Sequence, residues 1–249
     1  MALALSRIAC RRAACHRALS TFYDSQSGRT ITVPGSSGVR LHAPAAPALA
    51  APHARVTSVL CATLEQAAAH QRLHASAQAF APWRAAADVA RAAELRVGLE
   101  LSAACGAAGG LAPAVRAAQA QGVPLRVVLQ RCFETRPGGD PDANLQQRAL
   151  EADVALLAAE LDVPAIVLSD CGGAATDEAL RCAVEESFYL DVAGETVRER
   201  LGVRLAGGPQ RAALLHDALA LGVTRIDCGS AEGEAEVARL AAALPPRKQ

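Results

Sequence analysis

The stretch Ala112–Leu129, APAVRAAQAQGVPLRVVL, contains the unit that decides the fold. A helical segment stops at Gly122-Val123-Pro124, and the apolar run Leu125–Leu129, which has the length of a strand, follows at once. The same kind of junction recurs at Asp162-Val163-Pro164 and at Gly222-Val223. A helix that repeatedly ends just before a buried strand is typical of alternating α/β folds.

Outward from this unit, apolar runs of strand length alternate with helical stretches. We predict strands at Val56–Leu60, Leu95–Leu101, Leu125–Leu129, Ala165–Leu168, Val203–Leu205 and Thr224–Asp227. We predict helices at Thr63–Phe80, Ala112–Gln121, Asn144–Leu161, Thr176–Val184, Gln210–Leu221 and Glu232–Leu244. Because these strands are largely apolar and do not alternate, they favour a parallel sheet covered by helices. An open doubly wound sheet and a (β/α)₈ barrel both satisfy this pattern, and no GxGxxG or GxxxxGK[ST] follows the first strand.

The chain divides into three segments. Residues 1–20 are rich in Arg, Ala and Leu and contain no acidic residue, which is typical of a mitochondrial targeting segment. Residues 21–54 form an extended arm that ends in a Pro/Ala linker, and 55–249 form the α/β domain. Within the arm, Thr30–Val33 and Val39–Leu41 are predicted to form a hairpin, and they either complete the sheet or leave its edge for a partner.

Composition excludes several functions. Among 249 residues, Lys+Arg and Asp+Glu are 25 each, and aromatics are 3%, so we expect no nucleic-acid partner. No segment has the roughly 20 apolar residues of a membrane span. The only lysine is Lys248, which excludes a Schiff-base lysine within the domain. The eight cysteines include no CxxC pair, and we expect them to be free thiols.

Four stretches resemble the 3-hydroxy-3-methylglutaryl-CoA lyase family, which are mitochondrial, metal-dependent TIM-barrel enzymes. They are Val59–Glu65 for the family's third strand, Pro124–Cys132 with Arg136–Gly139 for the fifth, Ala165–Gly173 for the sixth, and Ala218–Asp227 for the last helix and strand. The resemblance covers roughly residues 56–230. It implies an α/β, (β/α)₈ TIM-barrel-like fold with an extended N-terminal arm. The family's first two strands have no counterpart in the sequence, so the barrel can be incomplete.

The departures from the family pattern concern its catalytic residues. The family binds metal through an Asp on the first strand and a His-x-His on the seventh, but the seventh strand here reads Val203–Gly208, VRLAGG. The family's catalytic Cys lies in a Gly-rich loop after the eighth strand, and Cys228 stands too early to match it. We therefore predict no catalytic residue and no metal site, with Asp170 as a vestige of the active face.

Several other side chains are candidate site residues. A ligand pocket at the carboxyl ends of the strands would be lined by Arg131, Arg136 and Asp170. His70 and His74 are spaced as a helical metal clip that lacks a third ligand. Glu134 is a candidate base, and Cys228 with His216 a candidate nucleophile pair, but a solvated loop and a structural thiol explain them more simply.

Three functions remain open. The first is a non-catalytic, lyase-derived accessory subunit of a large mitochondrial assembly (a respiratory complex, the ATP synthase or the ribosome), in the matrix or on the matrix side of the inner membrane. It would bind other subunits through the N-terminal arm and the barrel edge, and would need no cofactor. The second is an active carbon–carbon lyase with a rebuilt site that uses Mg²⁺ or Mn²⁺. The third is an acyl-CoA or small-molecule binding module without turnover.

Overall fold

The computed structural model describes most of the residues from 56 to 205 and parts of both ends. Its backbone is described at 19–24, 29–34, 40–44, 56–133, 141–170, 179–180, 183, 191–192, 195–196, 200–205, 218, 223 and 225–228. Side chains are described chiefly within 57–133 and 147–170, and at several positions of the later strands.

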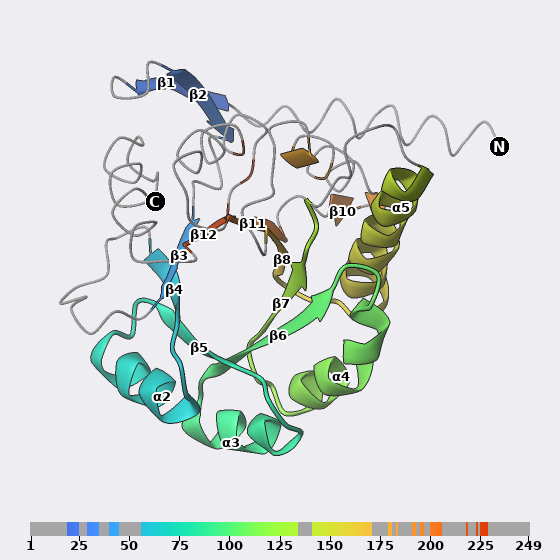
Figure 1. The fold of residues 1–249 in the computed structure, drawn as a ribbon. Coiled ribbons are helices and arrows are strands. Elements are labelled where there is room, and N and C mark those ends of the chain that lie inside the picture. The colour runs from blue at the N-terminus through green and yellow to red at the C-terminus, as the bar shows by residue number, and fades with distance from the viewer. Residues whose placement is uncertain are drawn as a thin grey trace.

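Eight parallel strands in this part of the chain close into a barrel (Figure 1). They are β3 (Arg40–Pro44), β4 (Val56–Leu60), β5 (Gln78–Pro82), β6 (Gly98–Ala104), β7 (Leu125–Gln130), β8 (Ile166–Ser169), β11 (Leu201–Leu205) and β12 (Arg225–Cys228). Neighbouring strands follow the order β11-β12-β3-β4-β5-β6-β7-β8. The predicted TIM-barrel-like α/β fold is therefore confirmed.

The N-terminal arm supplies a barrel strand. β3 pairs in parallel with β12 on one side, where Leu41 faces Ile226, and with β4 on the other, where His42 faces Ser58. Of the two segments that could complete the sheet, the one around Val39–Leu41 does so. The predicted hairpin between it and Thr30–Val33 is wrong, because β2 (Arg29–Pro34) pairs antiparallel with β1 (Leu19–Asp24) in a separate sheet.

A second barrel strand lies where a helix was predicted. The helix expected over Thr63–Phe80 ends early: α2 spans Leu64–Leu73, and β5 starts at Gln78. Alanine-rich sequence favours a helix locally, but here the pairing of β5 with β4 and β6 prevails over that propensity. With β3 and β5 in place, Val56–Leu60 is the second strand of the barrel rather than the third.

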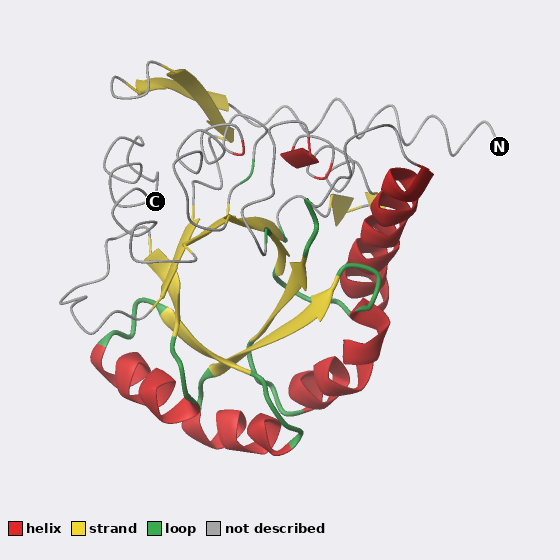
Figure 2. Ribbon diagram, in the orientation of Figure 1, coloured by secondary structure: helices red, strands yellow, loops and turns green. Residues whose placement is uncertain are grey.

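The described helices cover the outside of the barrel (Figure 2). They are α2, α3 (Ala87–Leu95), the short η1 (Ala108–Leu111), α4 (Ala112–Ala120), α5 (Pro141–Ala155) and the π-helical turn η2 (Leu156–Glu160). Thr63 caps α2, since its hydroxyl accepts a hydrogen bond from the Gln66 amide at 3.2 Å. A further two-stranded sheet joins β9 (Asp191–Val192) to β10 (Glu195–Thr196).

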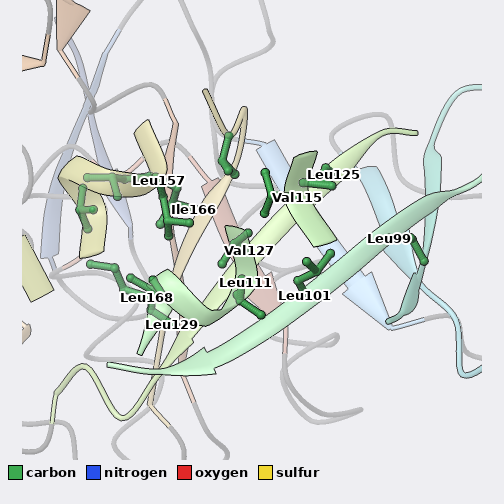
Figure 3. Close-up of a cluster of buried hydrophobic side chains, with 14 of the residues drawn as sticks. Leu99, Leu101, Leu111, Val115, Leu125, Val127, Leu129, Leu157, Ile166 and Leu168 are labelled. Atoms are coloured by element: carbon green, nitrogen blue, oxygen red, sulfur yellow. The ribbon is translucent and has the colours of Figure 1, made fainter. Parts of the chain in front are cut away.

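The barrel strands have an apolar outer face, which packs on the helices, and a partly ionic inner face. Side chains that point outward, such as Leu99, Val127 and Ile166, form one apolar cluster with the helices (Figure 3). Each is fully buried, which contributes about 1.5–3 kcal/mol per side chain. Because successive residues of a strand point to opposite faces, Glu100 and Arg126, next to these leucines and valines, point into the barrel. The inner face is therefore partly ionic.

The position of β3 leads to a prediction about truncated chains. A fragment of residues 55–249 lacks β3 and leaves β12 and β4 with open edges, so we expect it to aggregate or to melt without cooperativity. A fragment of residues 36–249 keeps β3 and loses only the β1–β2 sheet, so we expect a cooperative melt. Size-exclusion chromatography and thermal denaturation followed by circular dichroism compare the two. A monomeric, cooperative melt of 55–249 would contradict the placement of β3.

Candidate functional site

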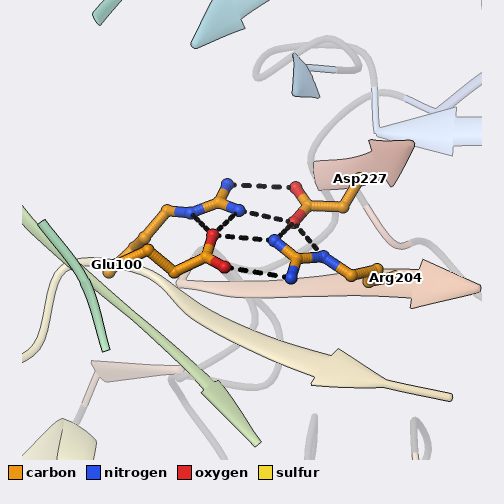
Figure 4. Close-up of polar contacts among 4 residues, drawn as sticks. Glu100, Arg204 and Asp227 are labelled. Carbon is orange, nitrogen blue, oxygen red and sulfur yellow. Dashed lines mark hydrogen bonds and ion pairs between the residues drawn. The ribbon is translucent and has the colours of Figure 1, made fainter. Parts of the chain in front are cut away.

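Four charged side chains meet inside the barrel (Figure 4). Glu100 on β6 lies beside Arg126 on β7 in the strand register, and Arg204 on β11 lies beside Asp227 on β12. Glu100, Arg126 and Asp227 are 8%, 3% and 3% exposed, and the Arg204 side chain is 19% exposed. In the sheet, β7 and β8 separate β6 from β11. The two pairs therefore meet only because the sheet curls into a closed barrel.

Each arginine bridges both carboxylates. Arg126 donates from Nε to Glu100 at 2.6 Å, and from Nη1 and Nη2 to Asp227 at 3.3 and 2.9 Å; its Nη2 also donates to Glu100. Arg204 donates from Nε and Nη2 to Asp227 at 3.1 and 2.9 Å, and from Nη1 and Nη2 to Glu100 at 3.0 and 2.7 Å. All four oxygens of the two carboxylates thus accept charge-assisted hydrogen bonds.

The electrostatics keep the network ionised. Burial alone would raise the pKa of Glu100, but attraction to Arg126 and hydrogen bonds from Arg204 lower it below its ordinary value. Burial would lower the pKa of Arg204, but Asp227 and Glu100 raise it. Phe80 on β5 places its ring 5.5 Å from the Arg126 guanidinium carbon, which adds a cation–π contact. Two positive and two negative charges leave this part of the interior neutral.

Sequence reasoning missed this network. A visible feature points to it: each member has an apolar residue on both sides in its strand, as in Leu125-Arg126-Val127 or Ile226-Asp227-Cys228. A charge inside a buried strand is rare unless it is paired. The identity of the partners could not be predicted, because it depends on the register of strands far apart in the chain.

Arg204 lies on the seventh strand of the barrel, where the lyase resemblance would require His-x-His. The alternation that turns Arg204 inward also turns Gly202 inward, so the inner face of this strand carries a glycine and an arginine. A Cβ on Gly202 would stand 3.0 Å from the Cβ of Arg225, which leaves little room for a side chain. Within the described residues, no three His, Cys, Asp or Glu side chains are grouped as metal ligands.

Of the three residues predicted to line a ligand pocket, the structure describes two, and these differ in exposure. Asp170 follows β8, is buried, and its backbone amide donates to the Arg204 carbonyl at 2.9 Å. Arg131 follows β7, is exposed and has a left-handed backbone with φ of 65°. Arg136 lies outside the described residues. The structure thus places Arg131 and Asp170 at the same end of the barrel without showing a pocket that they share.

The remaining candidate side chains give no catalytic cluster in the described part of the chain. His70 and His74 do stack, with ring centroids 4.8 Å apart, as their helical spacing predicts. Burial and the nearby His74 lower the pKa of His70, and neither of its ring nitrogens has a hydrogen-bond partner. Glu134, His216 and the side chain of Cys228 lie outside the described residues.

The glycine-rich loop after β6 holds a carboxylate of the chain itself. The amides of Gly106 and Ala108 donate to Asp153 on α5 at 2.6 and 3.2 Å. These are the groups that would bind a phosphate in a glycine-rich loop. Because Asp153 occupies them, the loop acts as a structural link between β6 and α5.

Comparison with known proteins supports the fold. No protein-family model and no curated protein matches the chain. Among solved structures, it is similar to the carboxyl transferase domain of Rhizobium etli pyruvate carboxylase with oxamate and biotin, with a TM-score of 0.62 and 10% identity over 77% of this chain and 40% of that one. The same domain with 3-bromopyruvate gives a TM-score of 0.61 and 10% identity over 84% and 47%. At this identity the likeness establishes a shared TIM-barrel-like fold, and the chain spans less than half of those proteins.

No described helix has the length and apolar character needed to cross a lipid bilayer.

We predict that removing one carboxylate of the network lowers the free energy of unfolding substantially. Glu100→Gln leaves two buried guanidinium groups with one carboxylate, so we expect a loss of about 3–5 kcal/mol in the free energy of unfolding. The matched control is Glu94→Gln on α3, which removes an exposed ion pair with Arg91 and should cost less than about 1 kcal/mol. Urea denaturation of both variants measures the difference. Equal costs for the two variants would contradict a tightly paired interior.

Proposed function

We propose that the chain is a non-catalytic accessory subunit of a large mitochondrial assembly, built on a barrel of lyase ancestry. The observation that carries the proposal is the neutral network of Glu100, Arg126, Arg204 and Asp227 inside the barrel. Barrel enzymes act through polar groups at the carboxyl ends of their strands that remain available to a substrate. Here the four charges of the network are committed to one another, whereas the buried Asp170 at the end of β8 is not part of it.

The pairing opposes catalysis in a specific way. A general base must be able to accept a proton near neutral pH, which requires a carboxyl pKa raised towards that range. The pKa of Glu100 is shifted in the opposite direction by Arg126 and Arg204. Recruiting either carboxylate to a ligand would also leave two guanidinium groups to share the other carboxylate, at a cost of several kcal/mol. These features support a structural role for the barrel interior.

Lyase ancestry rests on two separate supports. One is the sequence resemblance to the 3-hydroxy-3-methylglutaryl-CoA lyase family over residues 56–230. The other is the barrel, whose fifth, sixth and seventh strands (β7, β8 and β11) fall where the resemblance assigns them, although β4, assigned as the third strand, is the second. Arg204 stands where that family would place a metal-binding histidine, which fits an ancestral site converted into an ion-pair network.

The arm supports the proposal of an assembly. The chain before β3 contributes the β1–β2 sheet, which the barrel does not need for closure. Two-stranded sheets are marginal on their own, so this one gains stability by packing on another surface. The Arg-rich residues 1–20 support delivery to the mitochondrial matrix. We propose that residues 21–34 bind a neighbouring subunit.

Native purification of the tagged protein from mitochondria tests the proposal. We expect co-migration with a megadalton complex in fixed stoichiometry. The matched variant deletes residues 21–34, which leaves β3 and the barrel intact and should release the protein from the complex. A free monomer or dimer that cleaves an acyl-CoA when supplied with Mg²⁺ or Mn²⁺ would contradict the proposal in favour of an active lyase. A free form whose melting temperature rises with acyl-CoA, without turnover, would contradict it in favour of a binding module.

A further inference from the structure

Two cysteines end neighbouring strands at the carboxyl end of the barrel. Cys105 directly follows β6, and Cys132 lies two residues beyond β7. The Cys105 amide donates to the Gln130 carbonyl at 2.9 Å, which continues the β6–β7 ladder. The Cys132 amide donates to the Ser169 carbonyl of β8 at 3.2 Å. Backbone hydrogen bonds therefore hold both residues in place.

The two thiols are coupled in their acidity. Cys132 Sγ donates to the Leu129 carbonyl oxygen at 3.0 Å, and the interaction between the Cys105 and Cys132 side chains shifts the pKa of each. Adjacent strands lie about 4.8 Å apart, and a disulfide requires a Cα separation of roughly 4.4–6.8 Å. Cys105 and Cys132 follow adjacent strands and are offset by one position, because Ala104 pairs with Gln130, so a bond between them needs little backbone movement.

The two thiols differ in exposure and in acidity. Cys105 is half-buried, whereas Cys132 is 6% exposed. The hydrogen bond from Cys132 lowers the pKa of Cys105, although burial and the Asp153 carboxylate oppose this. The same hydrogen bond and burial raise the pKa of Cys132 well above its ordinary value. Cys105 is thus the better placed to react first, because the thiolate is the reactive form and needs access to the reagent.

We propose that Cys105 and Cys132 form a redox-modification site that takes a low-molecular-weight disulfide as oxidant and closes to an intramolecular disulfide. The site is independent of the proposed accessory role, since it rests on the two thiols and their strands. It also differs from the ion-pair network, which lies inside the barrel and uses no cysteine.

The reaction balances as two thiol–disulfide exchanges. The Cys105 thiolate attacks one sulfur of the small disulfide; a new S–S bond forms, the old one breaks, and one small thiolate leaves and takes up a proton. Cys132 then loses its proton, and its thiolate attacks the sulfur of Cys105. This step forms the Cys105–Cys132 bond and releases the second small thiol. The protein loses two electrons and two protons, and the small disulfide gains them.

The bond would link two segments at the carboxyl end of the barrel. One is the loop after β6, which Asp153 holds through Gly106 and Ala108. The other is residues 131–133, directly after β7. Oxidation would tie these two segments together.

Peptide mapping tests the proposal on the full chain. The folded protein is equilibrated in mixtures of reduced and oxidised glutathione, alkylated without denaturant and digested with trypsin. Cleavage at arginine places Cys105 in residues 97–116 and Cys132 in residues 132–148, because Pro137 protects Arg136 from cleavage. We expect the two peptides to become disulfide-linked as the oxidised fraction rises, and to separate on return to reduced glutathione. Linkage only after unfolding, or of Cys105 to a different cysteine, would overturn the proposal.

Single substitutions distinguish the two roles. Cys132→Ser should stop the reaction at a glutathione adduct on Cys105, whereas Cys105→Ser should leave Cys132 unmodified under the same conditions. The matched control is Cys61→Ala, at the end of β4, where the thiol is buried and burial raises its pKa; linkage should be unchanged. Equal adduct formation at Cys132 in Cys105→Ser would overturn the assigned order. The wild-type mapping decides the main point even if a variant fails to fold.

Discussion

The pairing of two arginines with two carboxylates across the barrel interior is the interaction on which the rest of the structure depends. Interiors of eight-stranded barrels are usually filled by layers of branched apolar side chains. Here Glu100, Arg126, Arg204 and Asp227 occupy part of that space. A single unpaired charge there would cost several kcal/mol, so every member requires the others. Each of the four lies on a different strand, and the barrel must close in one register for all the hydrogen bonds to form.

This constraint joins the fold to the proposed function. Buried ion pairs are weak sources of net stability, since desolvation offsets most of their attraction. Their stronger effect here is on specificity, because a shift of one residue in any of the four strands would turn a charge towards the apolar helix layer. An interior organised in this way maintains the shape of the barrel.

The sequence predicts those parts of the fold that depend on local pattern. Leu125–Leu129, apolar except for Arg126, and the apolar run Ala165–Leu168 follow clear helix stops, and both are strands within a residue or two of the prediction. Gln78–Pro82 was missed because its alanines favour a helix locally, and Arg40–Pro44 was separated from the domain by the Pro/Ala stretch that follows it. In both segments, pairing with strands distant in the sequence determines the secondary structure, and the local sequence does not reveal that pairing.

For the candidate site too, the sequence predicts what depends on local pattern and not what depends on pairing between distant strands. Asp170 could be placed at the end of a strand from sequence, and it lies there. The ion-pair network could not be predicted, because its members are up to 127 positions apart and meet only through barrel closure. Likewise, Cys105 and Cys132 form no recognisable motif, and become neighbours only because β6 and β7 are adjacent.

A double-mutant cycle between Glu100 and Arg204 tests the central claim most directly. The two residues lie on β6 and β11, which are not neighbours, and a distance of 2.7 Å between Arg204 Nη2 and Glu100 Oε2 joins them across the barrel. Urea denaturation of Glu100→Gln, Arg204→Gln and the double variant gives their coupling energy. We predict a coupling of about 2 kcal/mol, within the range for contacting charged groups. Additive effects, within about 0.5 kcal/mol, would show that the two side chains do not meet and would contradict the account.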